Sequence, residues 1–387
     1  MVGTHAVSQR GYAVVKAAVG AGDNVAETPD ERATVDLVYI INMLDVGGAE
    51  IGACRAISGL DDDRYDVTVI ALDGCDPTFV ERRLPDATTV LDCRQIDDID
   101  GISALLTAIT SADVIVGSLF HSALLARVAG VVNRSAVVAT WQHNERFKNS
   151  FRRTISNLMN PLSDVILADS EPVAAMLRRE FGLSSEVVET VPIAGLSMSD
   201  FEPRNHRERD PVVVGSVGVL SEQKNYHTLL SVAEMLADEA IVFRIAGDGP
   251  KRDELESRIE DLGLENVRLL GHVDDLPAFL NDVDVYAQTS RFEGLCITVV
   301  EAMAAGLPVV GSDVSGIAYN VEAAENGYLH DPDDIGGFCT SIRKLANSLS
   351  KRRQFGERGR RFVERTYTRD VLIERFERAI RNGSART

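Results

Sequence analysis

Short apolar runs alternate with segments of helical periodicity from Val35 onwards. Such alternation is typical of a parallel sheet whose strands are joined by crossover helices. It is interrupted once, by the polar and Pro-flanked segment 201–211, and then begins again. We therefore predict an α/β protein with two doubly wound, Rossmann-like domains that face each other across a cleft. The predicted strands cover residues 35–43, 65–73, 113–119, 135–142, 164–170, 211–218, 241–247, 266–271, 283–290 and 308–311.

The length of 387 residues suits two domains, because single domains usually contain about 100–200 residues. We place the first domain at residues 34–204, the second at 205–365 and a terminal helix within 366–387. Residues 1–33 are rich in Gly, Ala and polar side chains, which predicts a flexible extension. Because Lys16 interrupts the only apolar candidate in this extension, we expect no signal peptide.

The chain is strongly acidic, with 59 Asp and Glu against 40 Lys and Arg and a net charge of −19. Only six of the basic residues are Lys. An acidic, Lys-poor surface favours solubility in concentrated salt, so we interpret the composition as that of a salt-adapted cytoplasmic protein. General affinity for a phosphate backbone needs a basic face, and we therefore expect no nucleic acid as a partner.

The cysteines and histidines give no indication of disulfides or of a metal site. Five Cys are scattered and never spaced as C-x-x-C, which is typical of reduced thiols in the cytosol. Seven His are dispersed without the spacing of metal ligands. No run of about 18 residues is apolar and free of charge, so we also expect no transmembrane helix.

Two carboxylates, Glu293 and Glu301, lie in the otherwise apolar stretch 290–316. The pattern predicts a loop, a helix over 297–305 and, after a Gly-x-Pro turn, a buried strand. Unpaired amides and the dipole at the helix start favour an anion such as a diphosphate. Glu301 can accept hydrogen bonds from a ribose, and Glu293 can reach a sugar. The alternative is that both are solvated carboxylates. The residues at the helix start are Gly294, Leu295, Cys296, Ile297 and Thr298.

This segment resembles the donor-binding signature of the retaining GT-B glycosyltransferases, family 4 in particular, in which EG and EAMAAGLPVV recur in this order. The resemblance implies a GT-B fold whose terminal helix crosses back to the first domain. It also implies transfer from a nucleotide-diphosphate sugar to a glycan or a lipid-linked saccharide, with retention of anomeric configuration and without a metal or a cofactor. Glu293 would then face the donor sugar, and Glu301 would bind the ribose.

The same resemblance implies further site residues, of which Lys224 and His143 join Glu293 as catalytic candidates. Lys224 would neutralise the diphosphate, although Val219 stands where the family usually has Arg. Each residue, taken alone, is also compatible with a tight turn, a solvated side chain or a structural histidine. The implied positions are Gly47 and Gly48 at the donor phosphates, Gly247 near the donor, Val273 near the nucleobase, His143 beside the transferred sugar and His121 at a strand end on the acceptor side.

Residues 144–157 form a local basic patch in which Phe147 and Phe151 share one face of a predicted helix. A basic amphipathic helix is typical of peripheral membrane proteins, and this one resembles the helix through which family members with lipid-linked acceptors bind anionic membranes. We therefore predict contact with the inner face of the membrane. The alternative is a solvated face that packs on the core. The basic residues are Arg146, Lys148, Arg152 and Arg153.

Two other functions stay open. A sugar-nucleotide 2-epimerase has a similar size and fold. A catalytically silent scaffold that binds a nucleotide sugar is also compatible, because Val219 and Ala194 replace residues that the family usually has. A donor-hydrolysis assay separates the three, since a transferase slowly releases free sugar, an epimerase produces a new epimer and a scaffold does neither.

Overall fold

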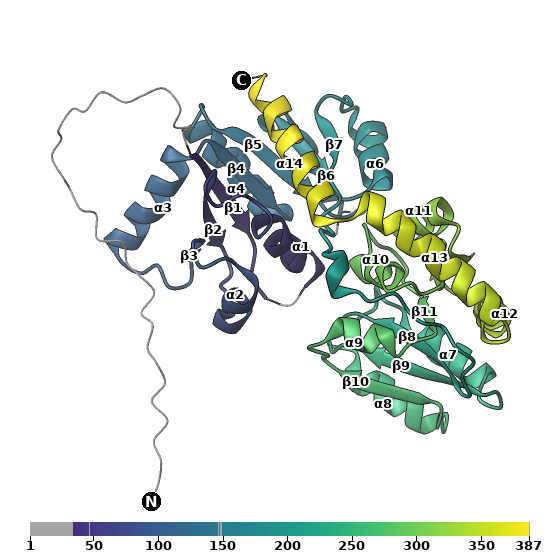
Figure 1. Ribbon diagram of the computed structural model, residues 1–387. Helices are drawn as coiled ribbons and strands as arrows, with labels where there is room; N and C mark the ends of the chain where they lie inside the picture. Colours follow the sequence, from purple (N-terminus) through teal and green to yellow (C-terminus); the bar gives the residue numbers. More distant parts are fainter. Residues whose placement is uncertain (1–33, 46, 146, 148, 387) are drawn as a thin grey trace, which may run out of the picture. The chain divides into compact units, whose positions relative to one another are not determined.

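The computed structural model describes residues 34–386 except 46, 146 and 148 (Figure 1). The predicted extension at residues 1–33 lies outside the described residues. The described chain builds two parallel sheets, one of seven strands and one of six. Buried hydrophobic clusters lie on both faces of each sheet, where helices cover the strands.

The first sheet has the strand order β3-β2-β1-β4-β5-β6-β7. Neighbouring residues of β1 point to opposite faces, with Tyr39 in one buried cluster and Ile40 in another. Burial on both faces explains the continuous apolar runs in the sequence. Its strands are β1 (Val35–Ile41), β2 (Tyr65–Ala71), β3 (Thr89–Asp92), β4 (Val114–Ser118), β5 (Val137–Gln142), β6 (Val165–Ala168) and β7 (Val188–Thr190). Its helices are α1 (Gly48–Ile57), α2 (Pro77–Arg83), α3 (Ile99–Ser111), α4 (Phe120–Val132), α5 (Ser150–Met159) and α6 (Glu171–Phe181).

The second sheet has the order β10-β9-β8-β11-β12-β13. Its first strand, β8, lies between β9 and β11, just as β1 lies between β2 and β4. Both sheets are therefore doubly wound, which confirms the predicted fold class. The strands are β8 (Val212–Val217), β9 (Ile241–Ala246), β10 (Val267–Gly271), β11 (Val285–Gln288), β12 (Val309–Ser312) and β13 (Gly327–His330). The helices are α7 (Tyr226–Met235), α8 (Arg252–Asp261), α9 (Leu276–Asn281), α10 (Ile297–Ala304), α11 (Ser315–Ala324), α12 (Ile335–Ala346) and α13 (Leu349–Thr366).

After α13 the chain returns to the first sheet as α14 (Arg369–Ser384), which lies along β5 and β6 (Figure 1). The ring of Phe376 stacks on Trp141 with 5.9 Å between the ring centroids. Two backbone hydrogen bonds of 2.9 Å also join Leu196 to Tyr367 and Arg369. The boundaries that the sequence places at residues 204 and 365 remain predictions.

Three strands were not predicted from the sequence: β3, β7 and β13. Each has three or four residues and lies at the edge of its sheet. An edge strand pairs on one side only, and most residues of these three are partly exposed. Their sequences therefore lack the long apolar run that marks a strand buried on both faces.

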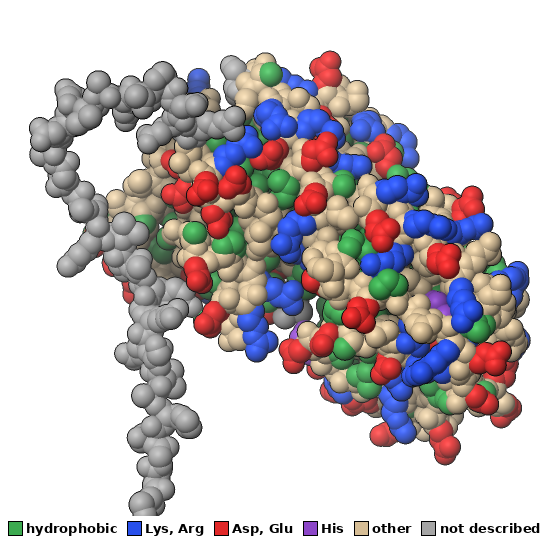
Figure 2. Space-filling view, in the orientation of Figure 1, with side chains coloured by type: hydrophobic (Ala, Val, Ile, Leu, Met, Phe, Trp, Pro, Cys, Tyr) green, Lys and Arg blue, Asp and Glu red, His purple; other side chains and the backbone are tan. Residues whose placement is uncertain are grey.

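The described surface mixes both signs of charge. On the face shown in Figure 2, Lys and Arg side chains are interspersed with Asp and Glu side chains. On the helices this mixture forms ion pairs four residues apart, such as Arg360 with Glu364 and Arg381 with Glu377. Within the described residues, we find no helix with the length and apolar character needed to cross a bilayer.

Candidate active site

Many of the predicted site residues lie in loops or at helix starts that follow the carboxyl ends of strands in both sheets. Gly48 follows β1, His143 follows β5, Lys224 lies between β8 and α7, and Glu293 lies between β11 and α10. Gly294 touches the backbone of His143, because a Cβ atom on Gly294 would lie 1.6 Å from the His143 carbonyl oxygen. Only glycine fits so close an approach. The loop before α10 therefore meets the end of β5.

Lys224 and Glu293 form a buried ion pair with 2.8 Å between Nζ and Oε1. The same carboxylate oxygen accepts a hydrogen bond of 2.7 Å from Ser290 Oγ, which in turn accepts one of 2.9 Å from Gln288 Nε2. Gln223 Nε2 donates to Oε2 of Glu293 at 3.3 Å. These side chains hold the Glu293 carboxylate in one orientation before any ligand arrives.

Lys224 is a cation across the physiological pH range. Burial opposes the charged form, but the charge of Glu293 and the hydrogen bond to Glu293 hold the pKa of Lys224 well above its ordinary value. Burial raises the pKa of the Cys296 thiol to about 12, so this thiol is protonated near neutral pH. Glu293 is therefore the group that supplies the negative charge beside Lys224.

Helix α10 begins beside this ion pair. Its N-cap, Cys296, has a φ of +56°, and the Sγ atom lies 4.0 Å from Lys224 Nζ. The amides of Ile297 and Thr298 have no acceptor within the helix, as at every helix start, and carry partial positive charge. A Cβ on Gly48, at the start of α1, would lie 4.0 Å from Ile297 Cδ1. The cation and the helix start together form a site suited to a diphosphate.

Glu301 lies on the second turn of α10 and is 3% exposed. Its Oε1 accepts a hydrogen bond of 2.6 Å from Nη2 of Arg55 on α1. Nη1 of Arg55 also donates to the carbonyl oxygen of Ala194 at 2.9 Å. A buried carboxylate is costly without such a partner. Arg55 therefore stabilises the charged form of the carboxylate that the sequence places near a ribose.

His143 is held on both sides by buried polar groups. Its Nδ1 lies 2.7 Å from Asp169 Oδ2, and its Nε2 lies 2.7 Å from Ser118 Oγ. Ser118 ends β4 and Asp169 follows β6, so three neighbouring strands contribute to this chain of hydrogen bonds. The ring also stacks on Trp141 with 6.2 Å between the ring centroids. Both ring nitrogens are engaged by the protein, which makes His143 a fixed part of the site.

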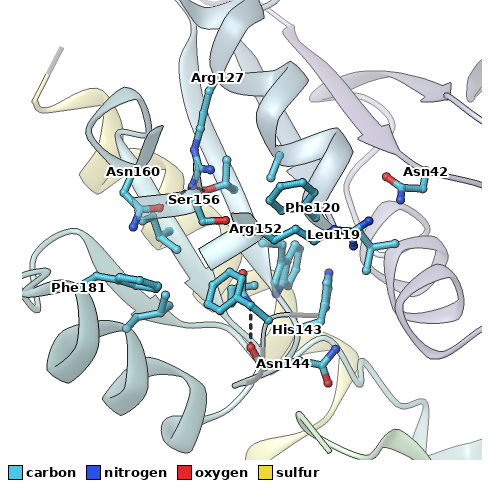
Figure 3. Close-up of a pocket in the computed structure, with 17 residues that line it drawn as sticks. Asn42, Leu119, Phe120, Arg127, His143, Asn144, Arg152, Ser156, Asn160 and Phe181 are labelled. Atoms are coloured by element: carbon cyan, nitrogen blue, oxygen red, sulfur yellow. Dashed lines mark hydrogen bonds between the residues drawn. The ribbon is translucent and has the colours of Figure 1, made fainter. Parts of the chain in front are cut away.

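A cavity of about 250 Å³ lies beside His143 at the carboxyl end of β5 (Figure 3). Aromatic and polar side chains from α4, α5 and α6 contribute to its lining. Among the described lining residues, Arg127 and Arg152 carry a permanent charge and none is acidic. Elsewhere too, the described residues contain no group of three or more His, Cys, Asp or Glu placed to hold a metal ion.

Two family models match this chain, one in each half. The model of Glycosyltransferase Family 4 matches residues 46–193, and the model of glycosyl transferases group 1 matches residues 198–362. The chain belongs to the family 4-like GT-B glycosyltransferases. The family predicted from the donor-binding signature is thus confirmed, and Lys224, Glu293 and Glu301 all fall in the second match.

Other glycosyltransferases resemble the chain over different lengths. An uncharacterized glycosyltransferase of Haemophilus influenzae is 25% identical over 354 residues, which are 88% of this chain and 98% of the relative. The lipopolysaccharide core biosynthesis glycosyltransferase LpsE of Rhizobium meliloti is 32% identical over 168 residues, which are 43% of this chain and 49% of LpsE. The match thus spans about half the length of LpsE. The structure of Anabaena HepE in complex with UDP and glucose shares the fold, with a TM-score of 0.77 and 20% identity over 90% of this chain and 99% of HepE.

Two residues of the chain lie elsewhere than the sequence predicted. His121 is exposed in the first turn of α4, not at a strand end, and the cavity is lined by its neighbour Phe120 instead. Phe147 packs edge to face on Phe181 in a buried cluster, so it does not share an exposed face with Phe151. The basic residues at 146 and 148 of the predicted patch lie outside the described residues.

The other donor-side positions lie on loops around the second sheet and at the start of α1. Gly247 has a φ of +133°, and a Cβ there would lie 2.0 Å from the Gly218 carbonyl oxygen, so the position requires glycine. Val273 packs against the buried cluster under α10. Val219 is 49% exposed in the loop after β8, and Gly47 is the N-cap of α1.

The sequence did not point to four polar residues that hold the candidate site: Arg55, Ser118, Asp169 and Ser290. Ser118 and Asp169 lie where predicted strands end, and ligands of open α/β sheets bind at these ends. A polar residue at the end of a predicted strand is therefore a signal that could have found both. Arg55 lies within α1 and carries no such signal.

Proposed function

We propose that the chain transfers a glycosyl group from a nucleotide-diphosphate sugar to a saccharide or lipid-linked acceptor, with retention of configuration and without a metal or a cofactor. The observation that carries this proposal is the buried pair of Lys224 and Glu293 beside the start of α10. An ammonium and the amides of Ile297 and Thr298 suit the charge of a diphosphate. The UDP and glucose bound to HepE, which shares the fold, support a ligand of this kind.

The two carboxylates of the signature suit the two ends of such a donor. Arg55 donates a hydrogen bond to Oε1 of Glu301, and no described side chain donates to Oε2. The Oε2 atom is therefore suited to accept a hydrogen bond from a ribose hydroxyl. Glu293 lies in the loop before the helix start, where its carboxylate is oriented by Ser290 and Lys224. We assign Glu293 to the hydroxyls of the transferred sugar, and Val273 to the neighbourhood of the nucleobase.

Cleavage of the bond between the sugar and the diphosphate places negative charge on the departing oxygen. We assign the stabilisation of this oxygen to two kinds of donor, Lys224 Nζ and the first amides of α10. Such prearranged donors stabilise charge that develops in a transition state. Lys224 thus has the role of a catalytic residue as well as a binding residue.

The groups around the cavity on the acceptor side favour a reaction that retains the anomeric configuration. The described cavity lining contains no carboxylate that could act as the general base of an inverting reaction, and the Nε2 atom of His143 is already hydrogen-bonded to Ser118 Oγ. In the proposed step the acceptor oxygen bonds to the anomeric carbon on the face that the diphosphate leaves. The acceptor proton passes to a diphosphate oxygen, which takes the place of a protein base.

The acceptor side of the proposal includes contact with a membrane. Phe151 and Leu158 lie seven residues apart on α5, which is two helical turns, and are 68% and 72% exposed. Two exposed apolar side chains on one helix face suit insertion between lipid headgroups. Phe147 takes no part in this contact, because it packs on Phe181.

Incubation of the purified chain with UDP-glucose, UDP-N-acetylglucosamine and GDP-mannose tests the proposed function. We expect slow release of nucleoside diphosphate and free sugar from at least one donor, with the α anomer formed first as seen by proton NMR. A new epimer would instead identify a 2-epimerase. Binding without any turnover would identify a silent subunit.

A further inference from the structure

The cavity beside His143 contains a buried arginine whose charge has no counter-charge among the described residues. Arg127 is 4% exposed. Its Nε donates to Ser163 Oγ at 2.9 Å, and its Nη2 donates to Asn160 Oδ1 at 2.9 Å and to Thr140 Oγ1 at 3.2 Å. All three partners are neutral. Burial lowers the pKa of Arg127 to about 10, so the guanidinium is still charged at neutral pH.

A second arginine reaches the same cavity from α5. The guanidinium carbon of Arg152 lies 4.8 Å from the centre of the Phe120 ring, and its Nη2 lies 3.5 Å from Nε2 of His121. Its neighbour in the chain, Arg153, points elsewhere and forms an ion pair of 3.1 Å with Glu180. Figure 3 shows Arg127 and Arg152 among the side chains around the cavity.

This concentration of positive charge is unexpected in a chain where acidic residues outnumber basic ones by 59 to 40. No described residue of the lining is acidic, although the cavity holds two guanidinium groups. A buried charge without a counter-charge is costly, and the structure retains one at Arg127. A ligand that brings a negative charge would remove this cost.

We propose that the acceptor carries an anionic group, a phosphate or a carboxylate, and that Arg127 and Arg152 bind this group in the cavity. The inference rests on the proposed function, because it assigns the acceptor to this cavity. A guanidinium binds both oxoanions through paired hydrogen bonds. Three hydrogen bonds orient Arg127, and its Nη1 donates to no described residue, which makes Nη1 the donor for the ligand.

Arg152 completes the site from the side of α5. It is only partly buried, so the substitution Arg152→Gln should leave the fold intact. The substitution Arg153→Gln is its matched control, because it removes the adjacent guanidinium, which does not line the cavity. Both variants are compared with the wild type as the full chain.

The test measures binding of inorganic phosphate, glycerol 1-phosphate and methyl glucuronide by calorimetry, with methyl glucoside as the neutral probe. Saturating UDP is present throughout and occupies the donor site, so that phosphate cannot bind there. We expect anion binding by the wild type, no binding of the glucoside, and at least tenfold weaker anion binding in Arg152→Gln but not in Arg153→Gln. Tighter binding of glycerol 1-phosphate than of the glucuronide would assign the group as a phosphate, and the reverse would assign it as a uronic acid.

Two results would overturn the inference: no binding of any of the three anions at millimolar concentration, or equal loss in the two variants. For Arg127, a folded Arg127→Met variant with a lower Tm but wild-type phosphate affinity would show that Arg127 is only structural. UDP binding by the wild type is measured separately beforehand. Its absence, together with the absence of GDP binding, would contradict the proposed function, whereas the phosphate titration still decides whether the cavity binds anions.

Discussion

Arg55 on α1 and Glu301 on α10 form an ion pair of 2.6 Å that joins a helix of the first sheet to a helix of the second. The side chains are 18% and 5% exposed, so solvent screens the pair only weakly. Arg55 also donates to the carbonyl oxygen of Ala194, which lies between the two sheets in the chain. Because Glu301 is also the proposed ribose ligand, donor binding and the contact between these helices share one carboxylate.

Replacement of this carboxylate should weaken the donor complex. We expect Glu301→Gln to lower UDP affinity by about 1.5–3 kcal/mol, the usual contribution of a hydrogen bond to a charged group. Calorimetry with UDP measures the effect. Glu322→Gln, an exposed change on the neighbouring helix α11, is the control. Unchanged UDP affinity in Glu301→Gln would remove the ribose assignment.

Substitutions in the pair of Lys224 and Glu293 should affect stability and catalysis differently. Lys224→Met leaves a buried carboxylate unpaired, so the free energy of unfolding should fall by about 3 kcal/mol. Donor hydrolysis should fall about 100-fold or more, because a donor to the leaving group is lost. The double variant Lys224→Met/Glu293→Gln should regain stability in urea but not hydrolysis. Recovery of hydrolysis in the double variant would show that Lys224 does not act on the diphosphate.

Asp169 should act on catalysis through His143. In Asp169→Asn the group at Nδ1 of His143 is a neutral amide, so the imidazole loses the carboxylate that orients it. A misplaced group near the reaction commonly costs about 100-fold in rate, and we expect kcat to fall by about 10- to 100-fold. KM for the donor should change little, since Asp169 lies on the acceptor side. An equal change in both constants would show a general loss of structure instead.

His206 should make the fold sensitive to acid. Burial lowers its pKa from 6.5 to about 4, and its Nε2 donates to the Gly306 carbonyl oxygen at 2.8 Å. As pH falls, the unfolded chain therefore binds a proton at this residue before the folded chain does. Stability is complete above about pH 6.5 and decreases down to about pH 4, by about 3 kcal/mol at 1.4 kcal/mol per pKa unit.

Urea unfolding between pH 7 and pH 4 measures this contribution. We expect the free energy of unfolding to fall less over this range in His206→Gln than in the wild type. The side-chain amide of Gln can still donate to Gly306 but has no group that titrates in this range. Parallel curves for the two proteins would assign the acid sensitivity to other groups.

The membrane contact should depend on Phe151 and Leu158. Wild-type chain should sediment with anionic vesicles, and Phe151→Ser/Leu158→Ser should remain in the supernatant. Ile102→Ser/Leu106→Ser is the control, because it removes two side chains that are 47% and 55% exposed on a different helix, α3. If the wild type stays in the supernatant at every salt concentration, or both variants sediment like it, α5 is only a solvated face.

Strand prediction succeeded for the strands that are buried on both faces and for one edge strand, β10. Strands such as β1 and β11 are covered on both faces, and this burial demands the continuous apolar runs that the sequence displays. The edge strands β3, β7 and β13 are not buried on both faces, so their sequences contain no continuous apolar run. The local sequence pattern therefore could not predict them.

The sequence by itself determined the two doubly wound sheets, the family and the placement of Glu293 before a helix that carries Glu301. Each of these follows from local pattern, because strand burial and helix starts are properties of neighbouring residues. Only the tertiary structure decided which groups these carboxylates meet. Arg55 is 246 residues from Glu301, and Lys224 is 69 residues from Glu293. Such partners depend on how sheets and helices pack, so no local pattern records them.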